Sequence, residues 1–130
     1  MFRTLFTAII RPHLEYGAPV WNPHLRKWID MIENVQRRAS KMVPCLSDLS
    51  YKQRLEALKL PTLQYRRYRG DMIEMFKLSH GYYDEVSVED FIKFGVNNTD
   101  EIRLRGHRYH VNKFRFKKDV RKYSFKCRVT

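Results

Sequence analysis

Cysteine is scarce in this chain of 130 residues, which holds only Cys45 and Cys127. Two cysteines fall short of the roughly four ligands that a structural zinc site needs. A disulfide between them is possible, but nothing else in the sequence supports one. We therefore expect two free thiols and a reducing, intracellular compartment, either the nucleus or the cytoplasm.

Long apolar runs are missing as well. No stretch approaches the roughly 18–20 residues that span a bilayer, so we expect no membrane partner. Residues 1–14 hold Arg3 and Arg11 but no acid, a composition that a mitochondrial presequence also has. A buried helix accounts for the same residues, and we favour it because the apolar side chains of residues 2–10 recur at helical spacing.

Sequence motifs for catalysis are absent. The five glycines are scattered, whereas the phosphate-binding loops of nucleotide-binding proteins need them clustered. The chain has no G-x-S-x-G motif and no adjacent aspartates for two-metal phosphoryl transfer. His107 and His110 lack a nearby cysteine or carboxylate to complete a metal site, so we expect a structural or nucleic-acid-facing role for them. The sequence predicts no catalytic residue, no metal, no cofactor and no small-molecule substrate.

Acidic residues are nearly missing from the C-terminal end. Residues 103–130 hold eleven Lys and Arg against Asp119 alone, whereas residues 1–102 hold fifteen against thirteen Asp and Glu. Clustered cations favour a polyanionic partner, because they gain free energy by displacing counterions from phosphates. The alternative is a solvated basic tail. Charge and hydropathy together divide the chain into a helical body (1–81), an acidic connecting segment (82–102) and a basic tail (103–130).

The apolar pattern predicts a mainly α fold, a small helical bundle followed by a basic tail that is partly irregular or short-stranded. The clearest helix covers residues 25–43, and Pro44 ends it. We also assign Trp21 to the core. The apolar stripe of the helix, which should be buried, consists of Leu25, Trp28, Ile29, Ile32, Val35, Ala39, Met42 and Val43.

Helix-breaking and capping residues delimit the other elements. Residues 2–10 form a helix that Pro12 should end or restart. The glycine and prolines of residues 17–23 mark a break. Ser50 is the expected N-cap of a short helix that holds Leu55.

A longer helix should begin at Thr62 as its cap and run to about residue 80, with Gly81 just beyond its end. Asp119 could cap a last helix in the tail. Aromatic and polar residues alternate across residues 109–116, which suits two short strands or an irregular ribbon. The expected apolar stripe of the longer helix is Leu63, Met72, Ile73 and Phe76.

Several short sequence blocks stand in a fixed order along nearly the whole chain. They are R-P-x-L-E-Y-G at residues 11–17, W-N-P at 21–23, V-Q-R-R-A at 35–39, L-S-Y-x-x-R-L at 49–55, L-P-T-L-x-x-R-R at 60–67 with D-M at 71–72, R-G-H at 105–107, and R…F-x-x-R-V at 121–129. Each block alone is short. Their order and spacing resemble the region that follows the palm in the reverse transcriptases of jockey-like non-LTR retrotransposons.

The resemblance implies a thumb-side fragment of an RNA-directed DNA polymerase. In that family the region after the palm is largely helical, and its thumb grips the RNA–DNA template–primer duplex through phosphate contacts. The palm, whose catalytic aspartates hold Mg²⁺ in the parent polymerase, lies upstream in the family and is missing here. The W-N-x-L-P that usually follows is missing too. The resemblance therefore implies a fragment that is inactive alone and whose further candidate partner is the missing palm.

The candidate phosphate-binding residues are basic side chains of the helices and the tail. Glu33 lies four residues before Arg37, so these two can pair on a helix surface. Arg66 and Arg69 have no obvious acidic partner. The full candidate set is Arg37, Arg38, Lys41, Arg66, Arg69, Arg103, Arg105, Arg108, Lys113, Arg115, Lys117, Lys118, Arg121 and Lys122.

Aromatic residues interleave with the tail cations at Tyr109, Phe114, Phe116 and Tyr123. They can stack on exposed bases or anchor the tail to the helical body, and we favour the anchor. Three functions stay open: an inactive thumb-type fragment, one part of an intact polymerase, and a protein-interaction module whose basic tail is incidental. A non-functional pseudogene product of the element is a further alternative.

Overall fold

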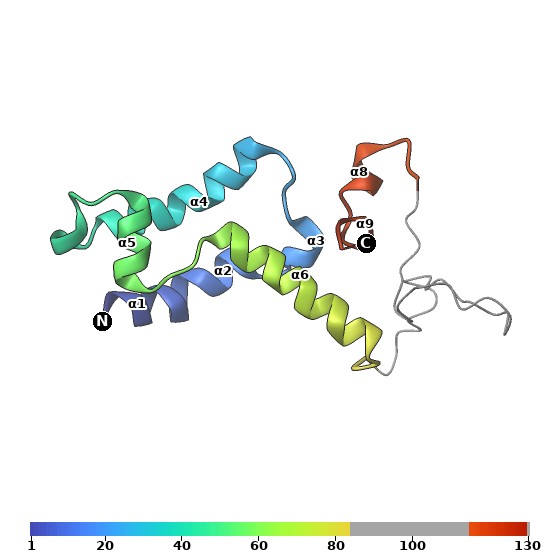
Figure 1. Cartoon of the computed structure of the whole chain (residues 1–130), viewed down its shortest axis with the longest axis horizontal. Coiled ribbons are helices and arrows are strands. Elements are labelled where there is room, and N and C mark those ends of the chain that lie inside the picture. Colours follow the sequence, from blue (N-terminus) through green and yellow to red (C-terminus); the bar gives the residue numbers. More distant parts are fainter. Residues whose placement is uncertain (84–114, 130) are drawn as a thin grey trace, which may run out of the picture. The chain divides into compact units, whose positions relative to one another are not determined.

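The computed structural model of the chain describes residues 1–83 and 115–129 (Figure 1). Every regular element in these ranges is a helix, which confirms the predicted mainly α fold. The chain divides into two compact units, Met1–Gly70 and Asp71–Thr130. The division falls inside helix α6 (Leu63–Ser79), so the two halves of this helix belong to different units.

The N-terminal helix of the first unit passes through Pro12 by widening. Proline has no N–H to donate, and its ring crowds the preceding turn. In the wide turn before it, the Arg11 N–H bonds the Phe6 carbonyl five residues back, and single π turns of this kind occur inside α-helices. The helical backbone is continuous from Phe2 to Glu15, so the prediction that Pro12 ends or restarts the helix is wrong. The segments are α1 (Phe2–Leu5), the π turn η1 (Phe6–Ile10) and α2 (Arg11–Glu15).

The backbone breaks at Gly17, as the sequence predicts. Gly17 has a φ of 63°, in the left-handed region that side chains with a Cβ rarely adopt. The predicted break nevertheless contains one helical turn, α3 (Ala18–Trp21). The indole N–H of Trp21 donates to the Tyr16 carbonyl. Because this bond holds the ring at the turn, 40% of Trp21 is exposed, and its predicted place in the core is wrong.

Helix α4 (Arg26–Lys41) matches the predicted helix to within two residues at each end. A 3-10 turn, η2 (Pro44–Leu46), leads from it to α5 (Tyr51–Leu58). Ser50 caps α5 as predicted. Its side chain accepts the Gln53 N–H, and the Gln53 side chain accepts the Ser50 N–H at 3.0 Å. This reciprocal capping box satisfies two N–H groups at the helix start.

Helix α5 ends in a Schellman motif around Lys59. Lys59 is left-handed, with a φ of 52°. The Leu60 N–H donates to the Leu55 carbonyl at 2.9 Å, and the Lys59 N–H donates to the Glu56 carbonyl at 3.1 Å. Leu55 and Leu60 are both buried, and they supply the apolar contact that accompanies this motif.

Two side chains hold the first turn of α6. Thr62 caps the helix as predicted and accepts the Tyr65 N–H at 3.2 Å. Glu33 of α4 accepts the Leu63 N–H at 3.0 Å and the Gln64 N–H at 3.3 Å. The Thr62 carbonyl accepts the Arg66 N–H at 3.1 Å. Glu33 and Thr62 together therefore satisfy the four N–H donors at the start of the helix.

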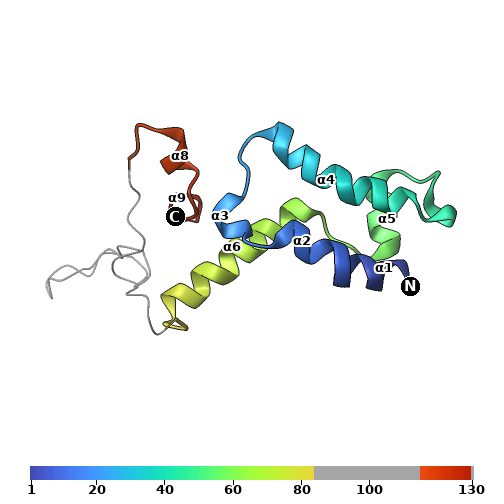
Figure 2. The ribbon, with the colours of Figure 1, turned by 180° about the vertical axis from the view of Figure 1, so that it is seen from behind.

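The apolar core of the first unit is small. Phe6, Leu55 and Leu60 are buried together, and the partly buried side chains around them are Phe2, Ala39, Tyr51 and Leu58. In both views of the ribbon, α5 lies beside the C-terminal half of α4 and next to α1 (Figures 1 and 2). The core therefore gathers where these three helices meet.

Helix α4 turns a largely polar face inward. Its buried residues are Ile29, Glu33, Gln36 and Ser40. Half of the predicted apolar stripe points outward instead, with 52% of Leu25, 46% of Trp28, 40% of Val35 and 79% of Met42 exposed. The predicted burial of these four residues is wrong, because hydrogen bonds to α5 and α6 hold the inner face of α4.

The second unit begins with the C-terminal half of α6, which ends in another Schellman motif. Gly81 has a φ of 66°. The Tyr82 N–H donates to the Lys77 carbonyl at 3.1 Å, and the Gly81 N–H donates to the Leu78 carbonyl at 3.4 Å. The predicted helix end at Gly81 is confirmed.

The predicted apolar stripe of α6 is only partly buried. Leu63 is fully buried at the start of the helix. In the second unit, Met72, Ile73 and Phe76 are 60%, 45% and 53% exposed. Burial of these three is therefore a wrong prediction, because the buried positions in this half of the helix are Asp71 and Leu78.

The described part of the tail is irregular over residues 115–118 and then forms α8 (Asp119–Lys122) and α9 (Phe125–Arg128). The single last helix predicted from Asp119 is wrong, because extended backbone at Ser124, with a ψ of 156°, interrupts it. Residues 109–114, where short strands were an alternative, lie outside the described residues. So does the acidic connecting segment, apart from its first two residues.

Replacing Lys59 by glycine should stabilise the chain. A left-handed residue with a Cβ costs roughly 1 kcal/mol, and glycine removes that cost while keeping both bonds of the Schellman motif. Urea denaturation of Lys59→Gly should show a free energy of unfolding about 0.5 kcal/mol above that of the parent chain. Lys52→Gly, inside α5, is the matched control and should be destabilising. A loss of stability in Lys59→Gly would contradict the assigned backbone.

Removing the Glu33 carboxylate should destabilise the first unit. Glu33→Ala leaves two N–H groups of α6 without an acceptor, and each buried unsatisfied donor costs about 1–3 kcal/mol. We expect a loss of about 3 kcal/mol in urea denaturation. Glu56→Ala, at an exposed acid of α5, is the control and should change the free energy of unfolding by less than about 0.5 kcal/mol. Equal losses in the two variants would show that Glu33 does not hold α6.

Candidate nucleic-acid interface

The predicted phosphate-binding residues fall into three groups. Outside the described residues lie Arg103, Arg105, Arg108 and Lys113. The first unit contains Arg37, Arg38, Lys41, Arg66 and Arg69. The second unit contains Arg115, Lys117, Lys118, Arg121 and Lys122. The contacts of each side chain decide which of these cations a phosphate can reach.

Arg66 is part of the fold. Its guanidinium forms a two-bond ion pair with Glu15 of α2, through Nε to Oε1 and through Nη2 to Oε2 at 2.8 Å. The hydrogen bond to Glu15 raises the pKa of Arg66. The prediction that Arg66 lacks an acidic partner is wrong, because Glu15 pairs with it. This partner could not be seen in the sequence, since Glu15 stands 51 residues away. Such two-bond pairs fix geometry as well as charge, so Arg66 is committed to holding α6 against α2.

Glu15 also faces a second arginine. The Arg11 Nε lies 3.9 Å from Glu15 Oε1. Burial lowers the pKa of Arg11, and the neighbouring charge of Arg66 lowers it further, while Glu15 raises it. One carboxylate thus serves two guanidinium groups, and this corner of the first unit keeps a net positive charge.

Arg37 is exposed but differs from the expectation in its contacts. It donates to the Asn34 side-chain oxygen at 2.8 Å, and its guanidinium lies 5.0 Å from the centre of the Tyr51 ring. Glu33 is 7% exposed and binds the start of α6. The predicted surface pair between Glu33 and Arg37 is therefore wrong, because the carboxylate points inward and the guanidinium outward.

Arg38, Lys41 and Arg69 are the available cations of the first unit. All three are exposed. Among the residues that the structure describes, none of the three forms a hydrogen bond or an ion pair. Arg38 and Lys41 stand three residues apart on α4, on the same side of the helix.

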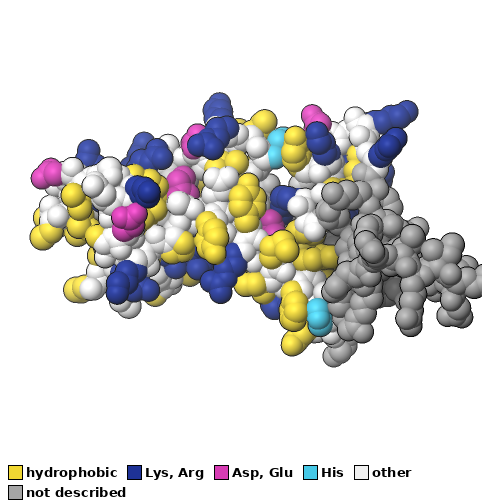
Figure 3. Space-filling model, in the orientation of Figure 1, with side chains coloured by type: hydrophobic (Ala, Val, Ile, Leu, Met, Phe, Trp, Pro, Cys, Tyr) yellow, Lys and Arg dark blue, Asp and Glu magenta, His cyan; other side chains and the backbone are white. Residues whose placement is uncertain are grey.

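The described tail gathers cations around an aromatic side chain. Residues 115–122 hold five Lys and Arg against Asp119 alone, and all five are exposed. The Arg121 guanidinium lies 5.9 Å from the centre of the Phe116 ring. Figure 3 shows Lys and Arg side chains projecting around α8. An open hollow in this segment is lined by Arg115, Phe116, Lys117, Lys118, Val120 and Arg121. We call this set the basic hollow.

Residues of the sequence blocks form a polar network inside the first unit. The Tyr51 hydroxyl donates to Glu33 and accepts from the Gln36 amide at 3.2 Å, and Gln36 also donates to the Pro61 carbonyl at 3.0 Å. Burial raises the pKa of Tyr51, and the hydrogen bond to Glu33 raises it further. Sequence reasoning missed these roles. The available signal was a polar set on α4, Glu33, Gln36 and Ser40, at the three- and four-residue steps of one helix face.

Arginines of two other blocks are also internal. Arg54 is 6% exposed, and its Nε donates to the Ser40 hydroxyl at 3.2 Å. In the second unit, Arg128 forms a two-bond pair with Asp71, at 2.8 Å and 3.0 Å. Asp71 is 3% exposed. The blocks thus supply contacts that hold each unit together, while the available cations lie mostly elsewhere.

Other functional chemistry is sparse within residues 1–83 and 115–129. In these ranges no helix has the length and apolar character to cross a bilayer. No group of three His, Cys, Asp or Glu side chains there is placed to hold a metal ion. Cys45 and Cys127 are free thiols. His107 and His110 lie outside the described residues.

In the comparisons with known proteins, no protein-family model, curated protein or solved structure matched this chain.

Alkaline pH should weaken the first unit through Tyr51. Its pKa is raised on folding, so its stabilising contribution is complete below about pH 10, the ordinary pKa of tyrosine, and is lost as the pH rises above that value. The free energy of unfolding of the parent chain should fall more steeply above about pH 10 than that of Tyr51→Phe. Tyr65→Phe, at an exposed tyrosine, should keep the parent slope. Parallel curves for the parent and Tyr51→Phe would contradict the hydrogen bond from the partly buried Tyr51 hydroxyl to Glu33.

Proposed function

We propose that this chain is the thumb-side part of a non-LTR retrotransposon reverse transcriptase and that it binds the RNA–DNA template–primer duplex through phosphate contacts. The observation that carries the proposal is the run of five exposed cations at residues 115–122. The resemblance of the ordered sequence blocks supports it. On this proposal the protein works in the nucleus or cytoplasm, and the palm is a further partner.

The charge of the duplex explains why exposed cations are sufficient to bind it. A duplex presents closely spaced phosphates, and contacts to them fix position without reading sequence. An RNA–DNA hybrid is held mainly through its backbone and shape. Exposed Lys and Arg that lack an acidic partner give their full charge to such a surface, whereas Arg66 and Arg128 already have carboxylates. The proposed contacts are therefore the basic hollow and Lys122 in the second unit and, separately, Arg38, Lys41 and Arg69 in the first unit.

Catalysis is not part of the proposed function of this chain. The metal ions of polymerase chemistry belong, in the parent family, to the palm, and the proposal gives this chain no ligand for them. On this proposal the chain binds the duplex, and other parts of the polymerase position the reacting atoms.

Salt dependence of hybrid binding tests the proposal. Affinity of the full chain for a labelled RNA–DNA hybrid should fall with rising salt, because each neutralised phosphate releases counterions. In the triple variant Lys117→Gln, Lys118→Gln, Arg121→Gln, the slope of log affinity against log salt should shrink by about one unit for each phosphate that the variant no longer neutralises. Fluorescence anisotropy at several salt concentrations measures both slopes.

A neutralising change elsewhere is the control. Lys52→Gln in α5 and Lys59→Gln just after it remove exposed charges that are outside the candidate set, and they should leave the slope nearly unchanged. Equal slopes for the parent chain and the triple variant, or no binding of the hybrid at low salt, would refute the proposed phosphate contacts.

A further inference from the structure

The outward face of α4 carries an apolar strip that the first unit does not use. Trp28, Met31, Val35 and Met42 are 46%, 51%, 40% and 79% exposed. Steps of three, four and seven residues place these side chains on one side of a helix. The opposite side, from Ile29 to Ser40, is the buried one. These four large side chains therefore make no contribution to the small core. We call them the α4 strip.

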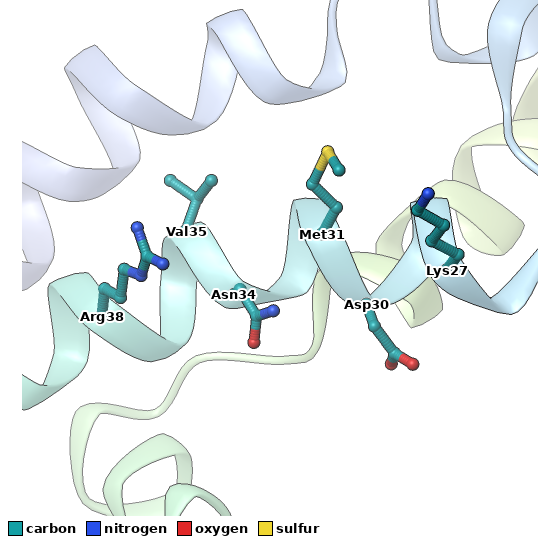
Figure 4. A pocket seen from close by; sticks show the side chains of 6 residues that line it. All are labelled: Lys27, Asp30, Met31, Asn34, Val35 and Arg38. Atoms are coloured by element: carbon teal, nitrogen blue, oxygen red, sulfur yellow. The ribbon is translucent and has the colours of Figure 1, made fainter.

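Cations border the α4 strip along one edge. Lys27 and Arg38 are exposed on α4. Lys27 stands four residues before Met31 and Arg38 three residues after Val35, so helical spacing sets each beside the strip. A hollow on this side of the helix is lined by Lys27, Asp30, Met31, Asn34, Val35 and Arg38 (Figure 4). In Figure 4, Met31 and Val35 project to one side, with Lys27 and Arg38 towards the two ends of the group.

The single acid of this hollow does not neutralise the edge. Asp30 pairs with Arg26 at 3.2 Å, and in Figure 4 it projects to the side away from Met31 and Val35. The edge of the α4 strip is therefore positive. An apolar surface with a positive edge is complementary to a partner that has an apolar face and a negative edge.

We propose that the α4 strip binds an amphipathic helix of a partner protein, with large apolar residues on one face and Asp or Glu along one margin. This inference goes beyond the proposed function, because phosphates require cations but give no reason to expose four large apolar side chains. Helix-in-groove recognition places apolar anchors at three- and four-residue steps. From Trp28 to Met42 the strip measures about 21 Å at 1.5 Å per residue, which four turns of a partner helix cover.

Designed helical peptides test this binding on the full chain. The probe is an 18-residue fluorescent peptide with leucine on one face and glutamate along one margin. Two control peptides carry lysine in place of glutamate, or serine in place of leucine. The acidic peptide should bind at least about tenfold more tightly than either control, since both the apolar face and the charge are required. Equal binding of the acidic and lysine peptides, or no binding of any peptide, would overturn the proposal.

Variants of the chain locate the site. The double variant Met31→Ser, Val35→Ser removes exposed apolar surface and should weaken the acidic peptide at least about tenfold. Met72→Ser, at an exposed apolar residue of the second unit, is the matched control and should leave the affinity unchanged. Both variants should keep their helices in far-UV circular dichroism, because none of these side chains is buried.

A charge-reversal variant distinguishes specific recognition of the peptide from nonspecific hydrophobic binding. Lys27→Glu with Arg38→Glu should reverse the preference, so that the lysine peptide binds about tenfold more tightly than the glutamate peptide. A preference that stays unchanged would overturn the assignment of the positive edge. If the RNA–DNA hybrid, and not the acidic peptide, loses affinity in Met31→Ser, Val35→Ser, the strip is a nucleic-acid surface and the proposed helix partner is wrong. Arg38 is also a proposed phosphate contact, so Met31→Ser, Val35→Ser, which keeps every cation, is the variant that separates peptide binding from hybrid binding.

Discussion

One buried carboxylate joins three helices of the first unit. Glu33 of α4 accepts the first two N–H groups of α6 and the hydroxyl of Tyr51 on α5. A buried charge is costly unless it is hydrogen-bonded, and here each contact also satisfies a group that would otherwise be unpaired. Negative charge at a helix N-terminus is favourable in addition. Because the apolar core is small, this polar junction sets how α4 lies against its neighbours.

The junction determines what the rest of α4 can do. With Glu33, Gln36 and Ser40 turned inward beside Ile29, Trp28, Met31 and Val35 face outward. The same logic sorts the arginines. Arg54 and Arg66 are engaged inside the first unit by Ser40 and Glu15, whereas Arg38, Lys41 and Arg69 are exposed. The surface is thus a mixture of apolar side chains and cations, and internal hydrogen bonding decides which of them a partner can meet.

Local sequence signals predicted the helix boundaries well. Ser50 and Thr62 cap their helices through contacts to residues three positions away, and Gly81 ends α6 through its left-handed backbone. These interactions depend on neighbours in the sequence. The buried faces were predicted poorly. The apolar periodicity predicted that Trp28 and Val35 are buried. The polar residues of α4 recur at the same helical spacing, and their face of the helix is the buried one.

In the candidate site too, contacts between sequence neighbours could be predicted, and contacts between residues far apart in the sequence could not. The sequence by itself determined the number of cations, their concentration near the C-terminal end, the helical class of the fold and the caps of α5 and α6, because composition and short-range contacts are sufficient for each. Only the tertiary structure decided that Arg66 pairs with Glu15, that Glu33 binds the N–H groups of α6 and not Arg37, and that the apolar strip of α4 faces outward. The partners in those contacts stand up to 51 residues apart, and only the packing of the helices brings them within hydrogen-bonding distance.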